Sequence, residues 1–210
     1  MSRKETLWKK GEEELIVILI GASGAGKSRI EKALANNFGY GKIVSYTTRS
    51  PREEEVNGID YNFIDNETFS DMIKDNLFAE YDEYSQNRLY GTLKSDYTEG
   101  NKVVVLTPNG FRKIKQNCET DNIYTVLVNA NLGTRIKRYI DRCGVENFNF
   151  DDKNEIASRV ERDFGMFLGL EKEVDIVINN DEGEDISSLA EKIHKVCQGK
   201  IKEDVLAYTE

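Results

Sequence analysis

The sequence is poor in the residues on which several kinds of catalysis depend. Histidine occurs once in 210 residues, at His194, in a stretch expected to form a polar helix. Triads that need a histidine base, and metal sites built from several histidines, are therefore nearly excluded. The three cysteines, Cys118, Cys143 and Cys197, are odd in number and far apart, so neither a disulfide framework nor a zinc site is indicated.

Long apolar runs and an excess of positive charge are also missing. No segment approaches the roughly 18 uninterrupted apolar residues of a membrane span, and residues 1–5 lack the apolar core of a secretory signal. We therefore expect a cytoplasmic protein that contacts no membrane. The formal net charge of −9 argues against broad nucleic-acid binding, although local arginines still permit a small phosphorylated substrate.

The chain does contain a glycine-rich turn that carries a lysine, GASGAGKS at residues 21–28. It follows the apolar run 15–20 and precedes the helix-compatible run 29–38. This context is typical of a P-loop, whose backbone N–H groups and helix N-terminus bind phosphates. Lys27 supplies a point charge for the outer phosphates, and the Ser28 hydroxyl is the usual magnesium ligand. A strand–helix turn without a ligand is the alternative. The candidate phosphate ligands are Gly21, Ala22, Ser23, Gly24, Ala25, Gly26, Lys27 and Ser28.

Apolar runs alternate with amphipathic ones, which predicts an α/β fold with a parallel sheet flanked by helices. Residues 47–98 break this pattern: they have short alternating runs and one helix at 67–74, which predicts a small, mostly antiparallel insertion. The Asn, Asp and Gly content of residues 144–153 predicts a mobile polar loop. We expect core strands at 15–20, 42–46, 102–107, 123–129 and 175–179, and helices at 27–38, 109–117, 132–143, 154–170 and 185–198.

A second constellation lies at the start of the insertion, in SYTTRSPR at residues 45–52. Its arginines, Arg49 and Arg52, stand three residues apart and are stiffened by Pro51. Guanidinium groups give paired, charge-assisted hydrogen bonds, so the two can converge on one phosphate. An exposed arginine pair on a turn is the alternative.

With these motifs in place, the chain resembles the guanylate kinases. The P-loop alone identifies a superfamily, whereas the joint run TTRxPR, GxDYxF and YG is more specific. The resemblance covers residues 15–196 and implies a single domain over 1–210. Its matching elements are GASGAGKS, VSYTTRSPR (44–52), EVNGIDYNF (55–63), FAEY (78–81), LYGT (89–92), two arginine segments and IVINN (176–180). Its implied parts are a core at 12–46, 99–131 and 172–198, a monophosphate-binding insertion at 47–98, a helical lid at 132–171, and a polar tail at 199–210.

The resemblance also implies roles for individual residues in the acceptor site. Glu80 can accept hydrogen bonds from N1–H and the 2-amino group of guanine, which adenine does not offer, and the Thr92 hydroxyl can donate to O6. A solvated strand carboxylate is the alternative for Glu80. The residues implied to hold the acceptor phosphate are Arg49, Arg52, Tyr61 and Tyr90, and those implied to read the base are Ser45, Glu80 and Thr92.

On the donor side, the resemblance implies that lid arginines act with Lys27 on the transferred phosphoryl group. These are Arg138 and Arg142 on one helix and Arg159, expected at the start of the next. An ordinary helix surface is the alternative for each. Asn179, at the end of the last strand, matches a position that contacts the donor adenine.

The third core strand departs from the family pattern. It reads Val105-Leu106-Thr107-Pro108, where such kinases typically carry L-D-I-D. With no aspartate at Val105, Mg²⁺ would rest on Ser28, the phosphates and water. With none at Thr107, guanine selectivity would depend on Glu80 alone among the acids, and Thr107 would offer a weaker hydroxyl contact.

The reaction expected from the resemblance is transfer of the γ-phosphoryl group of MgATP to GMP or dGMP, which gives ADP and the diphosphate. The partners are then small-molecule nucleotides and Mg²⁺, with no nucleic acid. Two alternatives stay open: a phospho-ligand-binding module without catalysis, and a kinase with another acceptor, such as a different or modified nucleotide or a sugar phosphate. The sequence does not choose between a monomer and a homodimer.

Overall fold

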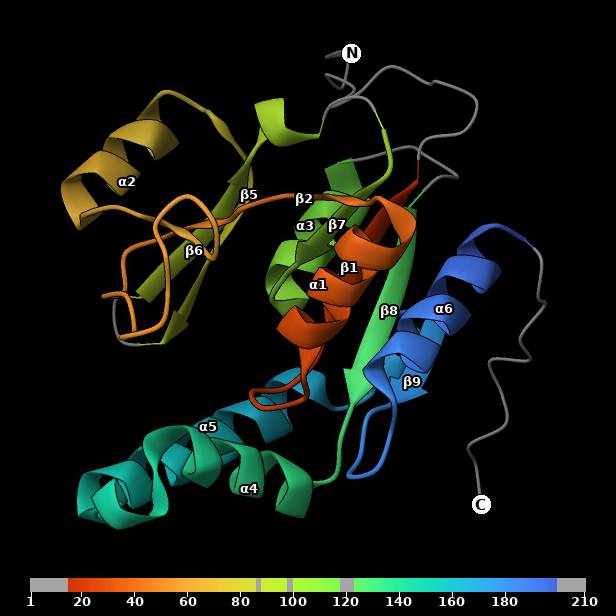
Figure 1. Ribbon diagram of the computed structural model, residues 1–210. Coiled ribbons are helices and arrows are strands. Elements are labelled where there is room, and N and C mark those ends of the chain that lie inside the picture. The colour runs from red at the N-terminus through yellow and green to blue at the C-terminus, as the bar shows by residue number, and fades with distance from the viewer. Residues whose placement is uncertain (1–14, 86–87, 98–99, 118–122, 200–210) are drawn as a thin grey trace. The chain divides into compact units, whose positions relative to one another are not determined.

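The computed structural model describes residues 15–85, 88–97, 100–117 and 123–199 (Figure 1). These residues divide into two compact units. The first contains residues 15–18 and the described part of 39–123; the second contains residues 19–38 and 124–199. Cys118 and the tail beyond residue 199 lie outside the described residues.

A parallel sheet forms the framework of the fold, with strand order β2-β7-β1-β8-β9 (Figure 1). In the first unit β2 pairs in parallel with β7, and in the second β8 pairs in parallel with β9. All five residues of β1 are buried, as a continuous apolar run requires when both faces of a sheet are covered. The predicted α/β class is therefore confirmed. The bounds are β1 Ile16–Ile20, β2 Gly41–Lys42, β7 Lys102–Val105, β8 Ile123–Asn129 and β9 Ile176–Asn179.

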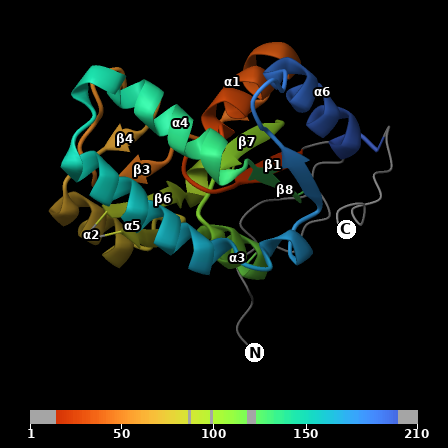
Figure 2. The same ribbon diagram turned by 90° about the horizontal axis from the view of Figure 1, so that it is seen from below.

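Two pairs of helices belong to the second unit. Helices α1 and α6 lie side by side, and so do α4 and α5 (Figures 1 and 2). The side chains of Ile30 and Leu34 on α1 and of Ile193 on α6 are fully buried. Side-chain caps fix two of the helix starts. Asn131 accepts from the amide of Thr134 at the start of α4, and Asp185 accepts from the amide of Ser188 at the start of α6. The bounds are α1 Lys27–Phe38, α4 Leu132–Cys143, α5 Phe150–Phe167 and α6 Ile186–Cys197.

The first unit contains a second, smaller sheet with strand order β4-β3-β6-β5. Strands β3 and β5 both pair antiparallel with β6, and β4 pairs in parallel with β3. Helix α2 contributes Phe69, whose ring stacks on Phe78 at a centroid distance of 4.4 Å. This is the small, mostly antiparallel sheet that residues 47–98 predicted. The bounds are β3 Tyr46–Thr47, β4 Asn62–Phe63, α2 Asn66–Lys74, β5 Phe78–Ser85 and β6 Arg88–Leu93, and α3 follows β7 at Pro108–Asn117.

The single strand expected at residues 42–46 is wrong. The chain leaves one sheet and enters the other within these residues. The amide of Ile43 donates to Val103 on β7, whereas the carbonyl of Ser45 accepts from Asn62 on β4. An apolar run shows that a segment is buried, but it does not show which partner strand satisfies each backbone group.

The mobile loop expected at residues 144–153 is also wrong. A 3-10 turn occupies Val145–Asn147, and α5 begins at Phe150. The Asn149 side chain caps this helix, and Asp152 bonds back to the Asn149 amide at 3.0 Å. Polar residues that indicated a loop are therefore the capping residues of a helix start. Helix α5 ends at Phe167, three residues earlier than expected, before Gly169 at φ +79°.

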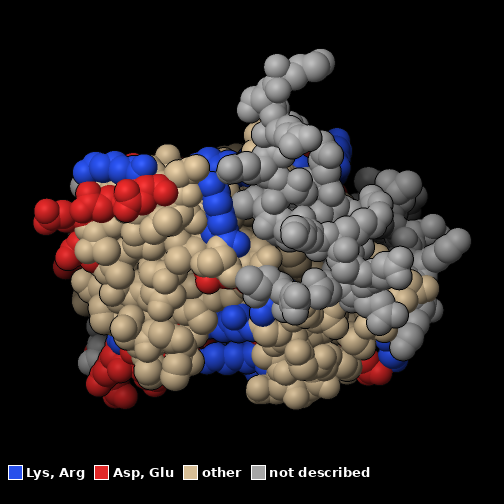
Figure 3. Space-filling view, turned by 90° about the horizontal axis from the view of Figure 1, so that it is seen from above, with Lys and Arg blue, Asp and Glu red and all other residues tan. Residues whose placement is uncertain are grey.

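Charged side chains on the face drawn in Figure 3 occur in small groups of either sign among uncharged residues. Within the described residues, no helix combines the length and apolar character that crossing a membrane demands.

Candidate nucleotide sites

The glycine-rich turn in the second unit adopts the backbone geometry of a phosphate-binding loop. Gly24 and Gly26 have φ of +82° and +93°, a region that disfavours other residues. A Cβ atom at Gly26 would lie 2.2 Å from Nδ2 of Asn180. The loop therefore needs glycine at position 26 for two reasons: its backbone angle, and the close approach of the Asn180 side chain.

Lys27 reaches back over the loop that precedes it. Its ammonium donates to the carbonyl oxygens of Gly21 and Ala22, the second at 3.1 Å. Burial lowers the pKa of Lys27 from 10.5 to about 8, partly offset by the charge of Asp163. Ser28, the predicted magnesium ligand, is exposed as the second residue of α1. The Lys27 ammonium and the exposed Ser28 hydroxyl therefore both lie at the N-terminus of α1, where a polyphosphate can bind.

Asn180 and Arg138 hold this loop from the neighbouring elements. Asn180 is 1% exposed, and its Nδ2 donates to the carbonyl of Ala25 at 2.7 Å. Arg138 donates to the carbonyls of Gly24 at 3.0 Å and Asn180 at 2.8 Å. The predicted catalytic Arg138 therefore contacts the loop directly. Asn180 is absent from the sequence-based site, although it ends the quoted IVINN run.

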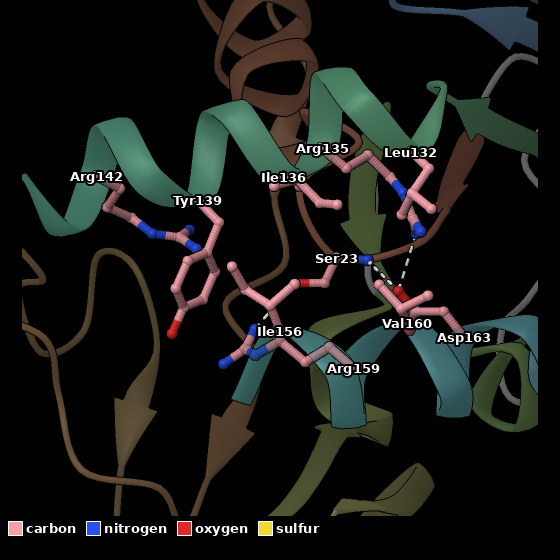
Figure 4. Close-up of a pocket in the computed structure, with 11 residues that line it drawn as sticks. Ser23, Leu132, Arg135, Ile136, Tyr139, Arg142, Ile156, Arg159, Val160 and Asp163 are labelled. Carbon is pink, nitrogen blue, oxygen red and sulfur yellow. Dashed lines mark hydrogen bonds and ion pairs between the residues drawn. The ribbon is translucent and has the colours of Figure 1, made fainter. Parts of the chain in front are cut away.

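The other predicted lid arginines flank one aromatic ring. The guanidinium carbons of Arg142 and Arg159 lie 5.3 Å and 5.5 Å from the ring centroid of Tyr139 (Figure 4). Arg159 also donates to Ser23 Oγ at 2.9 Å and to Glu155 at 2.8 Å. It lies in the middle of α5, not at a helix start as expected. Ser23, Tyr139, Arg142 and Arg159 line one pocket of the second unit.

A buried ion pair beside this pocket was not predicted. Arg135 donates to the Asp163 carboxylate at 2.9 Å, and the amide of Ser23 donates to the same oxygen at 3.1 Å (Figure 4). The pair connects α4, α5 and the glycine-rich loop. Asn179, the predicted adenine contact, accepts from Asn129 at 3.2 Å, so it ends β9 beside the end of β8.

In the first unit the two predicted phosphate-binding arginines do converge on one anionic group. That group is the carboxylate of Glu55, which accepts two hydrogen bonds of 2.6 Å from Arg49 and one of 3.0 Å from Arg52. Burial acts to raise the pKa of Glu55, but the bonds from Arg49 and from the Arg52 amide outweigh it and hold the pKa at about 2. The guanidinium groups of Arg49 and Arg52 are therefore close enough to bind one anion together.

The two predicted tyrosines extend this arginine cluster. The Arg49 guanidinium lies 4.9 Å from the centroid of the Tyr61 ring, and the Tyr61 and Tyr90 rings meet edge-on at 5.9 Å. Strand pairing places Tyr90 opposite Thr47, two residues before Arg49. All four predicted phosphate ligands, Arg49, Arg52, Tyr61 and Tyr90, therefore belong to one connected group.

The predicted base-reading residues form a second buried group in the same unit. Thr92 donates to Glu80 Oε1 at 2.9 Å and lies 2.9 Å from the Tyr97 hydroxyl. Glu80 is 5% exposed, so the solvated alternative for this carboxylate is wrong. Burial raises its pKa from 4.5 to about 7, with the nearby Asp82 charge adding to the effect. Ser45 is also buried, at the entrance of β3.

Thr107 lies two residues beyond the end of β7, not within the strand expected to reach it, and its hydroxyl is hydrogen-bonded. Its hydroxyl donates to Asp82 at 2.7 Å and accepts from the amide of Gly110 at 3.0 Å. A Cβ atom at Gly110 would lie 2.4 Å from Oε2 of Glu80, so glycine at this position makes room for that carboxylate. Asp82 was missed because nothing in the local sequence separates it from the exposed acid beside it.

The described residues contain no cluster of three or more His, Cys, Asp or Glu side chains that could hold a metal ion. At the loop, Ser28 offers an exposed hydroxyl. Such a hydroxyl fits a divalent cation that arrives with a polyphosphate and does not fit a resident metal.

A glycine-rich loop with phosphate-loop geometry joins a strand to a helix, beside arginine-bearing helices, and a separate cluster combines arginines and tyrosines. Together these features define a P-loop protein. The family model described as guanylate kinase matches residues 13–196. The chain therefore belongs to the guanylate kinase family.

Individual relatives agree with this assignment. A guanylate kinase of Malacoplasma penetrans is 29% identical over 93% of this chain and 98% of its own length. One from Lactobacillus johnsonii is 31% identical over 80% of this chain and 81% of its own. One from Lactobacillus delbrueckii subsp. bulgaricus is 40% identical, but that match spans only 50% of this chain and 54% of the relative. The crystal structure of guanylate kinase from Anaplasma phagocytophilum has a TM-score of 0.67 at 20% identity, covering 93% of this chain and 90% of that one, which supports the fold.

Proposed function

We propose that the protein transfers the γ-phosphoryl group of MgATP to GMP or dGMP, giving ADP and GDP or dGDP. The observation that carries the proposal is the arginine cluster of the first unit. Two arginines and two tyrosines form one cluster, in which both arginines bind the Glu55 carboxylate. The same unit contains the buried, hydrogen-bonded side chains of Glu80 and Thr92, which can bind a base. A phosphate joined to a purine matches both groups.

The donor ATP binds at the glycine-rich loop in this proposal. Backbone amides and the N-terminus of α1 receive the phosphates, and Lys27 leaves its loop carbonyls to pair with the outer ones. The exposed Ser28 hydroxyl is available to the magnesium ion that accompanies ATP, which neutralises charge on the phosphates. Asn179 contacts the adenine.

Phosphoryl transfer needs little covalent chemistry from the protein. Lys27, Arg138, Arg142 and Arg159 stabilise the negative charge that spreads over the transferred group. Arg49, Arg52, Tyr61 and Tyr90 hold the acceptor phosphate so that its oxygen can attack in line, while Ser45, Glu80, Thr92 and Thr107 surround the base. The absence of a strong general base from this set agrees with a reaction in which the acceptor is already an anion.

A coupled assay for ADP, run with MgATP and GMP, dGMP, AMP or dTMP, tests the proposal. We expect turnover with GMP and dGMP and little with the other two. Failure to turn over any nucleoside monophosphate would contradict the kinase and leave a phospho-ligand-binding module. MgATP affinity then separates the two, because a binding module has no need of an intact loop and lysine.

A further inference from the structure

The acceptor site contains a second buried carboxylate that the sequence did not assign. Asp82 is 9% exposed and Glu80 is 5% exposed. They lie two residues apart on β5, so both point to the same face of the strand. On the neighbouring strand β6, Tyr90 pairs with Asp82 and Thr92 pairs with Glu80. One face of this hairpin thus carries two acids opposite two residues proposed to contact the acceptor.

One side chain from the β7–α3 connection and one from the first turn of α3 hold the Asp82 carboxylate in place. Its Oδ2 accepts from Thr107 at 2.7 Å, and its Oδ1 accepts from Asn109 Nδ2 at 3.3 Å. Thr107 is in turn anchored by the Gly110 amide. Both carboxylate oxygens are therefore oriented by neutral donors, and each keeps a lone pair for a further hydrogen bond.

Among the described residues, no salt bridge reaches Glu80 or Asp82, although the charge of Lys113 acts on the pKa of Glu80 and partly offsets the effect of its burial. One Glu80 oxygen is already used by Thr92. Burying two neighbouring carboxyl groups without a direct ion pair costs free energy, and such groups concentrate at functional sites. When both groups are ionised they offer acceptor oxygens only, and a ligand edge that presents several N–H donors side by side favours that ionised form.

We infer that Asp82 is a specificity-determining residue of the acceptor site, which supplies from β5 the second carboxylate that binds the N–H donors of a guanine edge. This inference rests on the proposed function. Thr107 then acts as a positioning residue, because its hydroxyl orients Asp82. The departure at residue 107 therefore moves the second acid to a different strand, and Glu80 does not read the base alone. An adenine edge meets these acids with the acceptor N1 and is disfavoured.

The inference is tested by binding, without ATP. The affinities of GMP and of IMP, which lacks the 2-amino group, are measured by calorimetry for the wild-type protein and for Asp82→Asn. We expect the wild type to prefer GMP over IMP by about tenfold or more, the scale of one hydrogen bond to a charged group. Asp82→Asn loses most of that preference through weaker GMP binding, with IMP affinity little changed.

Two further variants make the result specific. Glu83→Gln removes an equal charge from the neighbouring, exposed position of β5, and we expect it to keep the GMP preference. Asp82→Ala combined with Thr107→Asp returns a carboxylate from the other side of the contact, and we expect it to restore the preference even if Asp82→Ala alone folds poorly.

The possible outcomes distinguish a failure of the role of Asp82 from a failure of the proposed function. A wild type that binds GMP, with an Asp82→Asn variant that keeps the full GMP-to-IMP ratio, overturns the role of Asp82 and leaves the proposed function standing. That result would mean that Asp82 only supports the start of α3. A wild type that binds neither nucleotide removes both the proposed function and the inference.

Discussion

The guanidinium of Arg49 and the carboxylate of Glu55 face each other through two parallel hydrogen bonds of 2.6 Å. The Arg49 side chain is 8% exposed and that of Glu55 14% exposed, so the pair is largely shielded from water. Arg52 binds the same Glu55 carboxylate from the turn. An internal acid therefore holds both predicted phosphate ligands in one place.

Replacing Glu55 by Gln should lower the free energy of unfolding at pH 7. The pKa of Glu55 is held at about 2, below its usual 4.5, so its ionised form stabilises the folded state. After allowance for partial screening, we expect a loss of about 1–3 kcal/mol, measured by urea denaturation. Because the folded-state pKa is depressed, the difference between wild type and variant is present above pH 4.5 and shrinks as the pH falls towards 2. A difference that is constant with pH would contradict this account.

Glu80 should show the opposite dependence. Its pKa is raised to about 7 by burial, so the folded protein holds a proton that the unfolded chain releases above pH 4.5. Stability is therefore lost as the pH rises from 4.5 to 7. We expect Glu80→Gln, which cannot ionise, to be about 2–4 kcal/mol more stable relative to wild type at pH 8 than at pH 4. Urea denaturation at both pH values measures this, and equal shifts at the two would count against a buried, protonated Glu80.

Lys27→Met should separate the donor site from the acceptor site. Removing the only side-chain cation of the loop should weaken MgATP binding at least about tenfold and leave GMP binding unchanged. MgATP should also raise the pKa of Lys27 from about 8, because phosphate favours the charged form. Wild type at pH 8 should therefore take up a proton on binding. Calorimetry in buffers of different ionisation enthalpy detects this uptake, which Lys27→Met should lack.

Asn180→Ala should loosen the glycine-rich loop. The variant loses the 2.7 Å bond to Ala25 and leaves that carbonyl without its partner. We expect a loss of about 1–2 kcal/mol of unfolding free energy and a higher KM for MgATP, with the KM for GMP little changed. The exposed Asn117 on α3 provides a control, since Asn117→Ala should alter neither quantity. Unchanged MgATP kinetics in Asn180→Ala would show that the loop keeps its form without this bond.

Local patterns predicted the parts of the fold that depend on neighbouring residues. The bounds of α1, α4 and β8 match the expected ranges, because helical periodicity and an apolar run are encoded within each segment. The glycine-rich loop was equally visible, since its angles and its lysine come from eight consecutive residues. The capping of α5 by Asn149 was misread because Asn serves both loops and helix starts.

Contacts between distant residues could not be predicted from the sequence. Asp82 meets Thr107 across 25 positions, Arg135 meets Asp163 across 28, and Asn180 meets Ala25 across 155. No periodicity or motif records such pairs, because they depend on how strands and helices pack. For the same reason, the sequence showed that residue 107 lacks the usual carboxylate, but it did not show that Asp82 on β5 brings a carboxylate to the same place.

Phosphorylation of GMP by ATP changes both nucleotides, so both can be followed in one experiment. Phosphorus NMR of wild-type protein with MgATP and GMP follows donor and acceptor together. We expect the β-phosphate signal of GDP to appear at the rate at which the γ-phosphate signal of ATP disappears, and we expect Lys27→Met to abolish both changes. Loss of ATP to inorganic phosphate without GDP, or no change in either nucleotide, would contradict it.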